Sequence, residues 1–348
     1  MTELLSTAAL ESNAVAADAA EPKKVAFLST AHVHAPGFVD KVKGRADVKC
    51  VAVWDPDAAR AADVAAKLGA RVVSQYADIL KDPDIAAVLV CSETNRHEEL
   101  VIAAAEAKKH VYAEKPLGLG ARDAFAMRDA VEKAEVLFST GYAMRGDPVN
   151  LFLREQIHAK AFGTITRVRK SVCHNGSLGH WFDNPGIRWM ADLAQAGVGG
   201  YGDLGTHGLD ILMWFFGDPV RVTANIHAVT HRYDDTDEFG EGILEFENGV
   251  VATLAAGWLD LADPWSVFIS GTEGFAYQSE GFHFKSQKVP GTPPMPPALP
   301  HAFDLFLDAV CGKTDAPLVT VREAAARSAV TESLYQAARE HTWVVPPK

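Results

Sequence analysis

The fold is decided by residues 23–69, which read KKVAFLSTAHVHAPGFVDKVKGRADVKCVAVWDPDAARAADVAAKLG. The apolar runs Val25–Leu28 and Lys49–Trp54 are rich in Val and too short for buried helices, so we predict that they are strands. The Ala-rich segment Asp57–Leu68 between turn signals has helical spacing and composition. Strands that alternate with helices predict βαβ units and a parallel, doubly wound sheet.

The alternation continues to about residue 145 and then stops. Further strands are expected at Ala87–Cys91, His110–Ala113 and Val136–Ser139. Beyond residue 147, strands follow one another across tight turns such as Glu247-Asn248-Gly249, which is typical of adjacent antiparallel strands. The predicted fold class is therefore an α/β Rossmann domain followed by an α+β domain with an open, mostly antiparallel sheet.

The expected organisation has four parts. Residues 1–22 form a flexible acidic arm, 23–145 the dinucleotide-binding domain, and 146–317 the substrate and oligomerisation domain. Residues 318–348 form a C-terminal helix and tail that pack back on the Rossmann domain. At roughly 150 residues per domain, the length of 348 residues agrees with two domains.

Composition excludes several partners. The net charge of -12 argues against nucleic acid or an anionic membrane surface. Apolar runs fall short of the roughly 18–20 residues that cross a membrane. The four cysteines, Cys50, Cys91, Cys173 and Cys311, are too scattered for a disulfide framework and indicate reduced thiols in a cytoplasmic protein. The histidine spacings favour no metal, so no metal site is predicted.

The first strand-to-helix turn matches a dinucleotide fingerprint poorly. The three places where glycine lets a backbone approach a pyrophosphate hold Ser29, Ala31 and His34. The next strand ends at Asp55, which suits the adenosine ribose hydroxyls or, equally well, an N-cap of the following helix. For His34, either the helix begins further from the sheet or the imidazole lies near the anion.

Three later segments are more specific. They are Cys91-Ser-Glu-Thr-Asn-Arg-His97, His110-Val-Tyr-Ala-Glu-Lys-Pro116 and Gly199-Gly-Tyr-Gly-Asp-Leu-Gly-Thr-His-Gly-Leu-Asp210. In order and separation they resemble the glucose-fructose oxidoreductase, inositol dehydrogenase and rhizopine-catabolism family (Gfo/Idh/MocA), over about residues 23–345. The sequence departs from the family in its degraded glycine fingerprint and in Glu93, where proline is common.

The Gly-rich segment leads into a predicted helix, Asp203–Phe216. At 100° per residue, Asp203, His207, Asp210 and Trp214 share one side, opposite Leu209, Leu212, Met213 and Phe216. The pattern predicts that the polar side faces a cleft or water. Read without the other motifs, it favours Asp203 as an N-cap and His207 as an ordinary exposed residue.

The resemblance implies roles for these residues. Lys115 polarises the reacting oxygen, His207 is the general base, Asp203 orients the lysine or the substrate, and Glu114 binds the nicotinamide ribose. The cofactor is expected to be NAD, with NADP less favoured. The expected cofactor site comprises Ser29, Ala31, His32, His34, Asp55, Ser92, Asn95, His97, Glu114 and Lys115.

A carbohydrate or cyclitol is the expected substrate, because five of the seven tryptophans lie between residues 181 and 265. The predicted pocket comprises Tyr142, Arg145, His174, Asn175, Trp181 and Arg188 together with Asp203 and His207. The sequence thus predicts an NAD-dependent sugar or cyclitol dehydrogenase or reductase that forms a homodimer or homotetramer. Two alternatives remain: an enzyme that recycles bound NAD while cleaving a glycoside, and a dinucleotide-sensing regulator.

Overall fold

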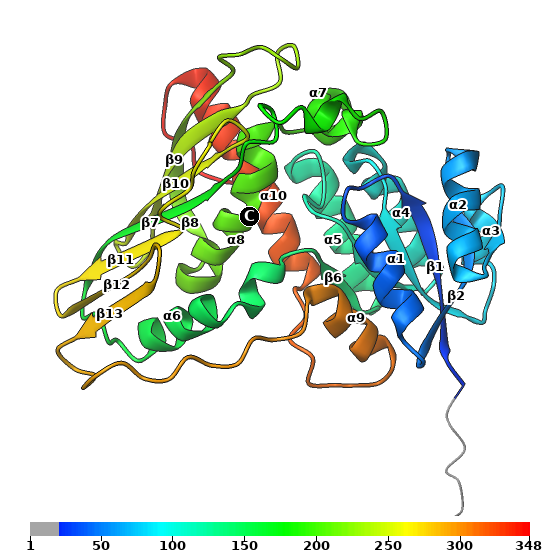
Figure 1. The fold of residues 1–348 in the computed structure, drawn as a ribbon, viewed down its shortest axis with the longest axis horizontal. Coiled ribbons are helices and arrows are strands. Elements are labelled where there is room, and N and C mark those ends of the chain that lie inside the picture. The colour runs from blue at the N-terminus through cyan, green and yellow to red at the C-terminus, as the bar shows by residue number, and fades with distance from the viewer. Residues whose placement is uncertain (1–20) are drawn as a thin grey trace, which may run out of the picture.

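The computed structural model describes residues 21–348 as two sheets joined by helices (Figure 1). The predicted arm at 1–22 lies almost wholly outside these residues. The first sheet has the order β3-β2-β1-β4-β5-β6, and every pairing in it is parallel, so the Rossmann prediction is confirmed. Its strands are β1 (Lys23–Thr30), β2 (Val48–Trp54), β3 (Arg71–Val72), β4 (Ile85–Cys91), β5 (His110–Ala113) and β6 (Phe138–Thr140).

Both faces of this sheet are covered, which is why its strands are apolar throughout. Side chains of α1 (Ala35–Gly44) and α2 (Ala58–Leu68) pack on one face, and those of α4 (His97–Glu106) and α5 (Ala121–Ala134) on the other. The short α3 (Tyr76–Leu80) contributes Ile79 to the core between the sheet and the helices α4 and α5.

The second sheet has the order β13-β12-β11-β7-β10-β9-β8 and is antiparallel except for the β7–β10 pair, as predicted. Its strands are β7 (Ile165–Cys173), β8 (Pro219–His227), β9 (Phe239–Phe246), β10 (Val251–Gly257), β11 (Val267–Gly271), β12 (Gly274–Gln278) and β13 (Phe282–Ser286). The helices α6 (Pro148–His158) and α8 (Gly200–Phe216) cover one face, and the opposite face stays open (Figure 1).

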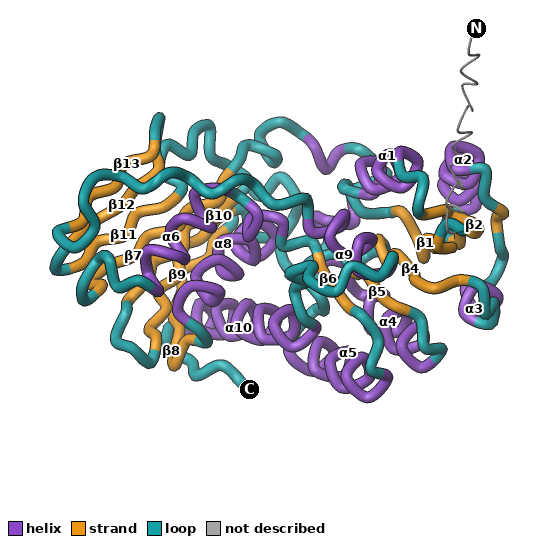
Figure 2. The backbone as a smooth tube through the Cα atoms, turned by 90° about the horizontal axis from the view of Figure 1, so that it is seen from below, coloured by secondary structure: helices purple, strands orange, loops and turns teal. Residues whose placement is uncertain are grey.

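Two C-terminal helices tie the sheets together. α10 (Val321–Glu340) lies beside α5 and also contacts β8 (Figure 2). α9 (Ala302–Val310) packs on the Rossmann sheet, where Phe303 stacks on Phe38, although the expected boundary at residue 317 assigned it to the second domain. The tail pairs Val344 with Val222 of the second sheet rather than with the Rossmann domain. Among residues 21–348 no helix is both long and apolar enough to cross a membrane.

Candidate active site

The two motifs of the sequence meet at the end of β5. Lys115 follows β5 and extends its Nζ to within 2.7 Å of Oδ1 of Asp203, and both residues are buried. Nε1 of Trp258, which is also buried, donates to the other carboxylate oxygen of Asp203 at 3.2 Å. Burial alone raises the pKa of Asp203, but the Lys115 ammonium outweighs burial and holds that pKa below its ordinary value. The site therefore contains a rigid ion pair supported from both domains.

Asp203 is held in the first turn of α8 by a cap that the sequence did not reveal. The helix begins at Gly200, three residues before the predicted start, and Asp237 accepts hydrogen bonds from the backbone N–H groups of Gly199 and Tyr201. A Cβ at Gly200 would lie 2.4 Å from the Glu238 carbonyl oxygen, so only glycine allows this approach. Asp203 is thus not the N-cap, and its carboxylate is free to pair with Lys115.

His207 lies one turn after Asp203. Its ring meets that of the buried Tyr142 edge-on at 6.2 Å, and the Tyr142 hydroxyl is bonded to Thr206. Nδ1 of His207 is buried without a hydrogen-bond partner within residues 21–348. Burial, reinforced by the Lys115 ammonium, lowers the pKa of His207 to about 3. The imidazole is therefore neutral, which is the form that accepts a proton.

Glu114 directly precedes Lys115 at the end of β5 and faces two histidines. Its carboxylate has no exposed surface, with Oε2 3.8 Å from Nε2 of His32 and Oε1 3.4 Å from Nδ1 of His34. Within residues 21–348, Oε1 of Glu114 accepts no hydrogen bond. Burial acts to raise the pKa of Glu114, but the imidazoles and Lys115 outweigh it and the pKa lies below its ordinary value.

The polar face predicted for α8 is only half right. Asp210 is buried, and Arg145 and Arg327 both donate to its carboxylate, at 2.6 and 2.9 Å. Arg145 also donates to Glu323 at 2.7 Å and lies over Trp214. The prediction that Asp210 faces a cleft or water is wrong, because Arg145 and Arg327 enclose its carboxylate. Trp214 is half-buried and lines a separate cavity of about 260 Å³ together with Tyr142 and Arg145.

The expected adenosine end forms a second buried cluster. Asp55 accepts from the Thr30 backbone N–H at 2.8 Å and from Nε and Nη2 of Arg60 at 2.8 and 2.7 Å. The N-cap of α2 is Asp57, so the alternative role of Asp55 as that cap is wrong. Ser29 adopts a φ of 65°, the left-handed conformation for which glycine is usual at this place. The backbone thus keeps the turn although the glycine is lost.

The remaining cofactor residues are spread along the same edge. α1 begins at Ala35 with His34 at its N-cap. Ser92 is buried and Asn95 exposed, and both lie on the loop after β4. The ring of His97 is fully buried between the carbonyl oxygens of Leu117 and Ser92 and joins two loops rather than lining an open surface.

The expected substrate residues separate into two groups. Tyr142 and Arg145 are bound to neighbouring side chains behind His207, and Arg145 is engaged in the Asp210 cluster. The others lie on the loop after β7, where the rings of His174 and the exposed Trp181 lie 4.6 Å apart with their planes tilted by 38°. Asn175 and Arg188 on this loop are also exposed. Most of the loop residues are thus exposed, and Tyr142 and Arg145 line a separate cavity of about 260 Å³.

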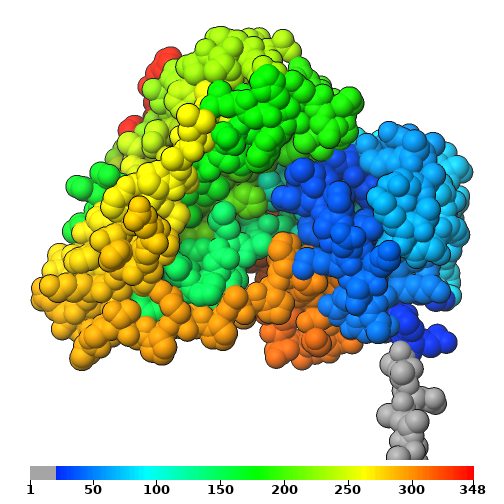
Figure 3. All heavy atoms as spheres, in the orientation of Figure 1, coloured from blue at the N-terminus to red at the C-terminus, as the bar shows by residue number. Residues whose placement is uncertain are grey.

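Two cavities flank the site. One, of about 470 Å³, is lined by His34, Phe38, Glu114, His207 and His301 among others. The other, between His32, Lys115, Trp189 and Asp203, is only about 10 Å³. Trp189 closes it, donating to the carbonyl oxygen of Ala31 at 3.2 Å, and the green segment that carries it lies against the blue Rossmann elements (Figure 3). Trp189, Trp258, Asp237 and His301 were missed by sequence reasoning, because only the fold brings them to the site.

The residues present fit a dinucleotide. The turn at Ser29 keeps its glycine-like backbone, and Asp55 stands at the tip of β2. Glu114 offers, at the wall of the larger cavity, an oxygen that no hydrogen bond from the described part of the chain satisfies. Lys115 follows the end of β5, and His207 lies with Glu114 on the wall of the larger cavity. The fold and the site together define an NAD-binding oxidoreductase with a Rossmann domain.

Family models place the chain further. Residues 28–142 match the oxidoreductase family with an NAD-binding Rossmann fold, and residues 151–277 match the Gfo/Idh/MocA C-terminal domain. The two matches together cover more than half of the chain. The protein belongs to the Gfo/Idh/MocA family, as the motifs around Lys115 and His207 indicated.

Curated relatives match over part of their length. Levoglucosan dehydrogenase of Pseudarthrobacter phenanthrenivorans is 30% identical over 51% of this chain and 44% of the relative. Myo-inositol 2-dehydrogenase of Thermotoga maritima is 41% identical over 34% of this chain and 35% of the relative. The chain thus aligns with less than half the length of either relative.

Solved structures share the fold over nearly the whole chain. Aldose-aldose oxidoreductase from Caulobacter crescentus superposes with a TM-score of 0.79 at 20% identity, over 93% of this chain and 99% of that one. Levoglucosan dehydrogenase in complex with NADH and levoglucosan gives a TM-score of 0.74 at 23% identity, over 93% and 99%. At these identities the likeness establishes the fold.

Proposed function

We propose that the protein transfers a hydride between NAD and a CH–OH or C=O group of a sugar, sugar derivative or cyclitol. The single observation that supports this most is the 2.7 Å Lys115–Asp203 pair beside a neutral His207, whose Nδ1 has no hydrogen-bond partner within residues 21–348, at the wall of a cavity next to Glu114. The relatives that act on levoglucosan and myo-inositol point to the same substrate class.

The side chains divide the chemistry as follows. When bound, NAD accepts the hydride in the oxidative direction and returns it in the reductive one. Lys115, held by Asp203, places its positive charge on the substrate oxygen, where negative charge develops. His207 takes the hydroxyl proton on oxidation and gives it back on reduction. Trp258 donates a hydrogen bond to Asp203 and so fixes the carboxylate that pairs with Lys115. The Lys115 ammonium therefore keeps its position during the reaction.

The test is a turnover screen that follows the absorbance of reduced nicotinamide with a panel of sugars and polyols, using NAD and NADP in turn and a chelator throughout. Net reduction of NAD by a member of the panel supports the proposal. Product release without net reduction would instead support the NAD-recycling alternative. NAD binding without any turnover across the panel would favour the regulator.

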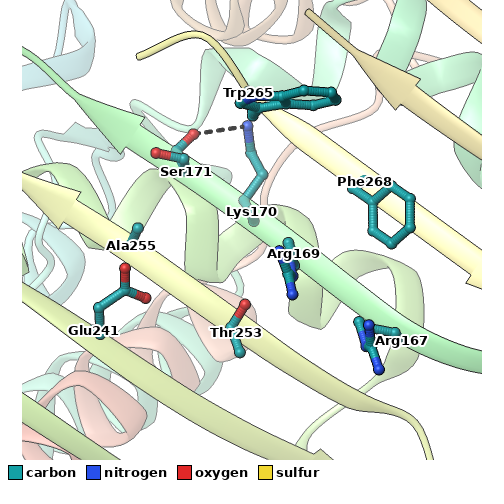
Figure 4. Close-up of a pocket in the computed structure, with 9 residues that line it drawn as sticks. All are labelled: Arg167, Arg169, Lys170, Ser171, Glu241, Thr253, Ala255, Trp265 and Phe268. Atoms are coloured by element: carbon teal, nitrogen blue, oxygen red, sulfur yellow. Dashed lines mark hydrogen bonds between the residues drawn. The ribbon is translucent and has the colours of Figure 1, made fainter. Parts of the chain in front are cut away.

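We further propose that the protein self-associates through the open face of the second sheet. This face carries a cavity of about 580 Å³ lined by Arg167, Arg169, Thr253, Trp265 and Phe268 among others (Figure 4). Trp265 and the neighbouring Ile243, Val251 and Phe275 are exposed by 54%, 37%, 40% and 37%. An apolar face of this kind is commonly covered by a second subunit. Sedimentation of the wild type and Trp265→Asp tests it: a wild-type monomer contradicts the proposal.

A further inference from the structure

His32, His34 and Glu114, which are all expected to line the cofactor site, form a cluster that takes no part in the proposed proton transfer. One ligand atom from each lies within 4.8 Å of the other two. His32 and His34 come from the turn after β1, and Glu114 comes from the end of β5, so two parallel strands of one sheet, with β4 between them, hold the three residues. The cluster is independent of the Lys115–Asp203 pair, although it borders it.

The side chains of the cluster are held in place for a cation. His32 is 3% exposed, and its Nδ1 accepts a hydrogen bond from the His34 backbone N–H at 3.3 Å, which leaves Nε2 facing Glu114. Glu114 is ionised, and the Lys115 backbone N–H donates to its Oε2 at 3.1 Å, which fixes the carboxylate as an outer-shell group would. Its Oε1 is buried and has no hydrogen-bond partner in residues 21–348, so this oxygen is available to coordinate a cation.

The donor set selects the metal. We propose that His32, His34 and Glu114 bind a divalent transition cation of the zinc class. Two imidazoles and one carboxylate suit Zn²⁺ or Co²⁺, whereas Mg²⁺ and Ca²⁺ prefer oxygen ligands throughout. His34 is 44% exposed at its side chain and lines the larger cavity, so a cation can enter and a fourth position stays open to water or a ligand oxygen.

Coordination has one local cost. The His34 backbone N–H lies 3.3 Å from Nδ1 of His32, so the neutral ring carries its proton on Nε2, the atom nearest Glu114. A metal at Nε2 moves that proton to Nδ1 and opens this long contact at the N-cap of α1. The ligand atoms must also close from 3.4–3.8 Å to the spacing of a coordination shell. Both changes stay within the turn at 32–34.

The experiment uses the full chain, cleared of metal with a chelator and free of NAD. We expect calorimetry to give one Zn²⁺ per chain, and Co²⁺ to give the visible bands of a four-coordinate ion. His34→Ala lowers Zn²⁺ affinity by about 100-fold or more, since even the loss of an outer-shell group costs about 10- to 100-fold. His34 is partly exposed and its side chain makes no capping hydrogen bond, so this variant is expected to fold.

Two matched histidine variants act as controls. His180→Ala removes an exposed histidine that is paired with Asp183 outside the cluster, and His301→Ala removes one from the same cavity wall. Both are expected to bind Zn²⁺ like the wild type, while Glu114→Gln is expected to lose binding as His34→Ala does. Equal Zn²⁺ affinity in wild type and His34→Ala, or an equal loss in His301→Ala, overturns the assignment. Because the titration omits NAD and the turnover screen contains chelator, each proposal can fail alone.

Discussion

α8 carries two buried carboxylates whose surroundings are opposite. Asp210, in the middle of the helix, receives two guanidinium groups and belongs to a closed cluster with Arg145, Arg327 and Glu323. Asp203, in the first turn, pairs with a single ammonium and lines a cavity of only about 10 Å³. Around it Glu114 and His207 each keep a buried polar atom without a partner in the described residues, whereas the Asp210 cluster keeps none of its carboxylate oxygens free.

This difference separates a site from a structural support. The carboxylate of a saturated ionic cluster has no hydrogen-bonding capacity left for a ligand, and the Asp210 cluster joins α8 and α10 to the turn before α6. An unsaturated cluster pays in stability for groups that a ligand can satisfy. The comparison predicts that changes at Asp203's end affect turnover and changes at Asp210 affect folding.

The largest effect is expected from Lys115→Ala. Removing the only ammonium at the reacting oxygen should lower kcat by about two to four orders of magnitude. The dissociation constant of NAD should change little, because the ammonium faces the substrate oxygen. Steady-state kinetics and an NAD titration on the same sample check this. Normal turnover in the variant contradicts the role of Lys115 and removes the distinction between the clusters.

Asp210→Asn tests the other half. It leaves the Arg327 side chain, 4% exposed, beside a neutral amide, and breaking a buried ion pair should lower the free energy of unfolding by about 3 kcal/mol. The kcat of the remaining folded protein should stay near that of the wild type. Denaturant unfolding and kinetics measure the two quantities. A large fall in kcat at unchanged stability would place Asp210 in the site after all.

Helix α8 also shows what the sequence could and could not predict. The strands of the Rossmann sheet were predictable because short apolar runs between helices have few alternatives, and Lys115, Asp203 and His207 were predictable from motifs that resemble a family. A helical wheel, however, assigns faces without saying what covers them. Asp210 was therefore placed in the cleft, although Arg327 reaches it from a helix more than a hundred positions along the chain.

The histidine cluster was missed for a related reason. His32 and His34 are two positions apart in the sequence, but their carboxylate partner is Glu114, and only the neighbouring positions of β1, β4 and β5 in the sheet bring them together. No spacing along the chain encodes that distance. The contact of Trp258 was missed for the same reason, since its hydrogen bond to Asp203 depends on how the second sheet packs against α8.

The buried His32 near Asp203 should also make the free energy of unfolding depend on pH. The folded pKa of His32 is lowered to about 3, so between that value and its usual pKa the unfolded chain binds the extra proton and stability falls as pH falls. From about pH 7 to about pH 5 this one group should cost about 2 kcal/mol. His32→Asn should remove that part of the pH dependence, measured by unfolding at both values. An unchanged dependence would mean that His32 titrates normally.

Trp258→Phe should give a smaller, purely positional effect. It removes the N–H that donates to Asp203 while keeping an aromatic ring in the core. We expect kcat to fall about tenfold with KM nearly unchanged, the cost of one hydrogen bond to a charged group. Trp265→Phe, on the open sheet face, is the matched control. A loss confined to stability, with kcat intact, would make Trp258 a packing residue only.

The smallest effect is expected at the adenosine end, which resembles the Asp210 cluster more than the Asp203 one. Asp55 is saturated by Arg60 and by backbone N–H groups, so replacing it risks the fold as well as the cofactor preference. Glu93 is the better probe. Its Oε1 lies 3.6 Å from Nη2 of Arg60, and its buried Oε2 has no partner within the part of the chain described.

A 2′-phosphate at this end meets two carboxylates and one guanidinium that is already engaged, which favours NAD over NADP. Glu93→Gln removes one of the two negative charges and loosens Arg60, so the ratio of NADP to NAD affinity should rise about three- to fivefold, about 1 kcal/mol. Glu99→Gln, next to Arg96 on the exposed side of α4, should leave the ratio unchanged. Calorimetric titration of both nucleotides measures it. If both variants keep the wild-type ratio, Arg60 is held by Asp55 alone, and this cluster is as closed to ligands as the one around Asp210.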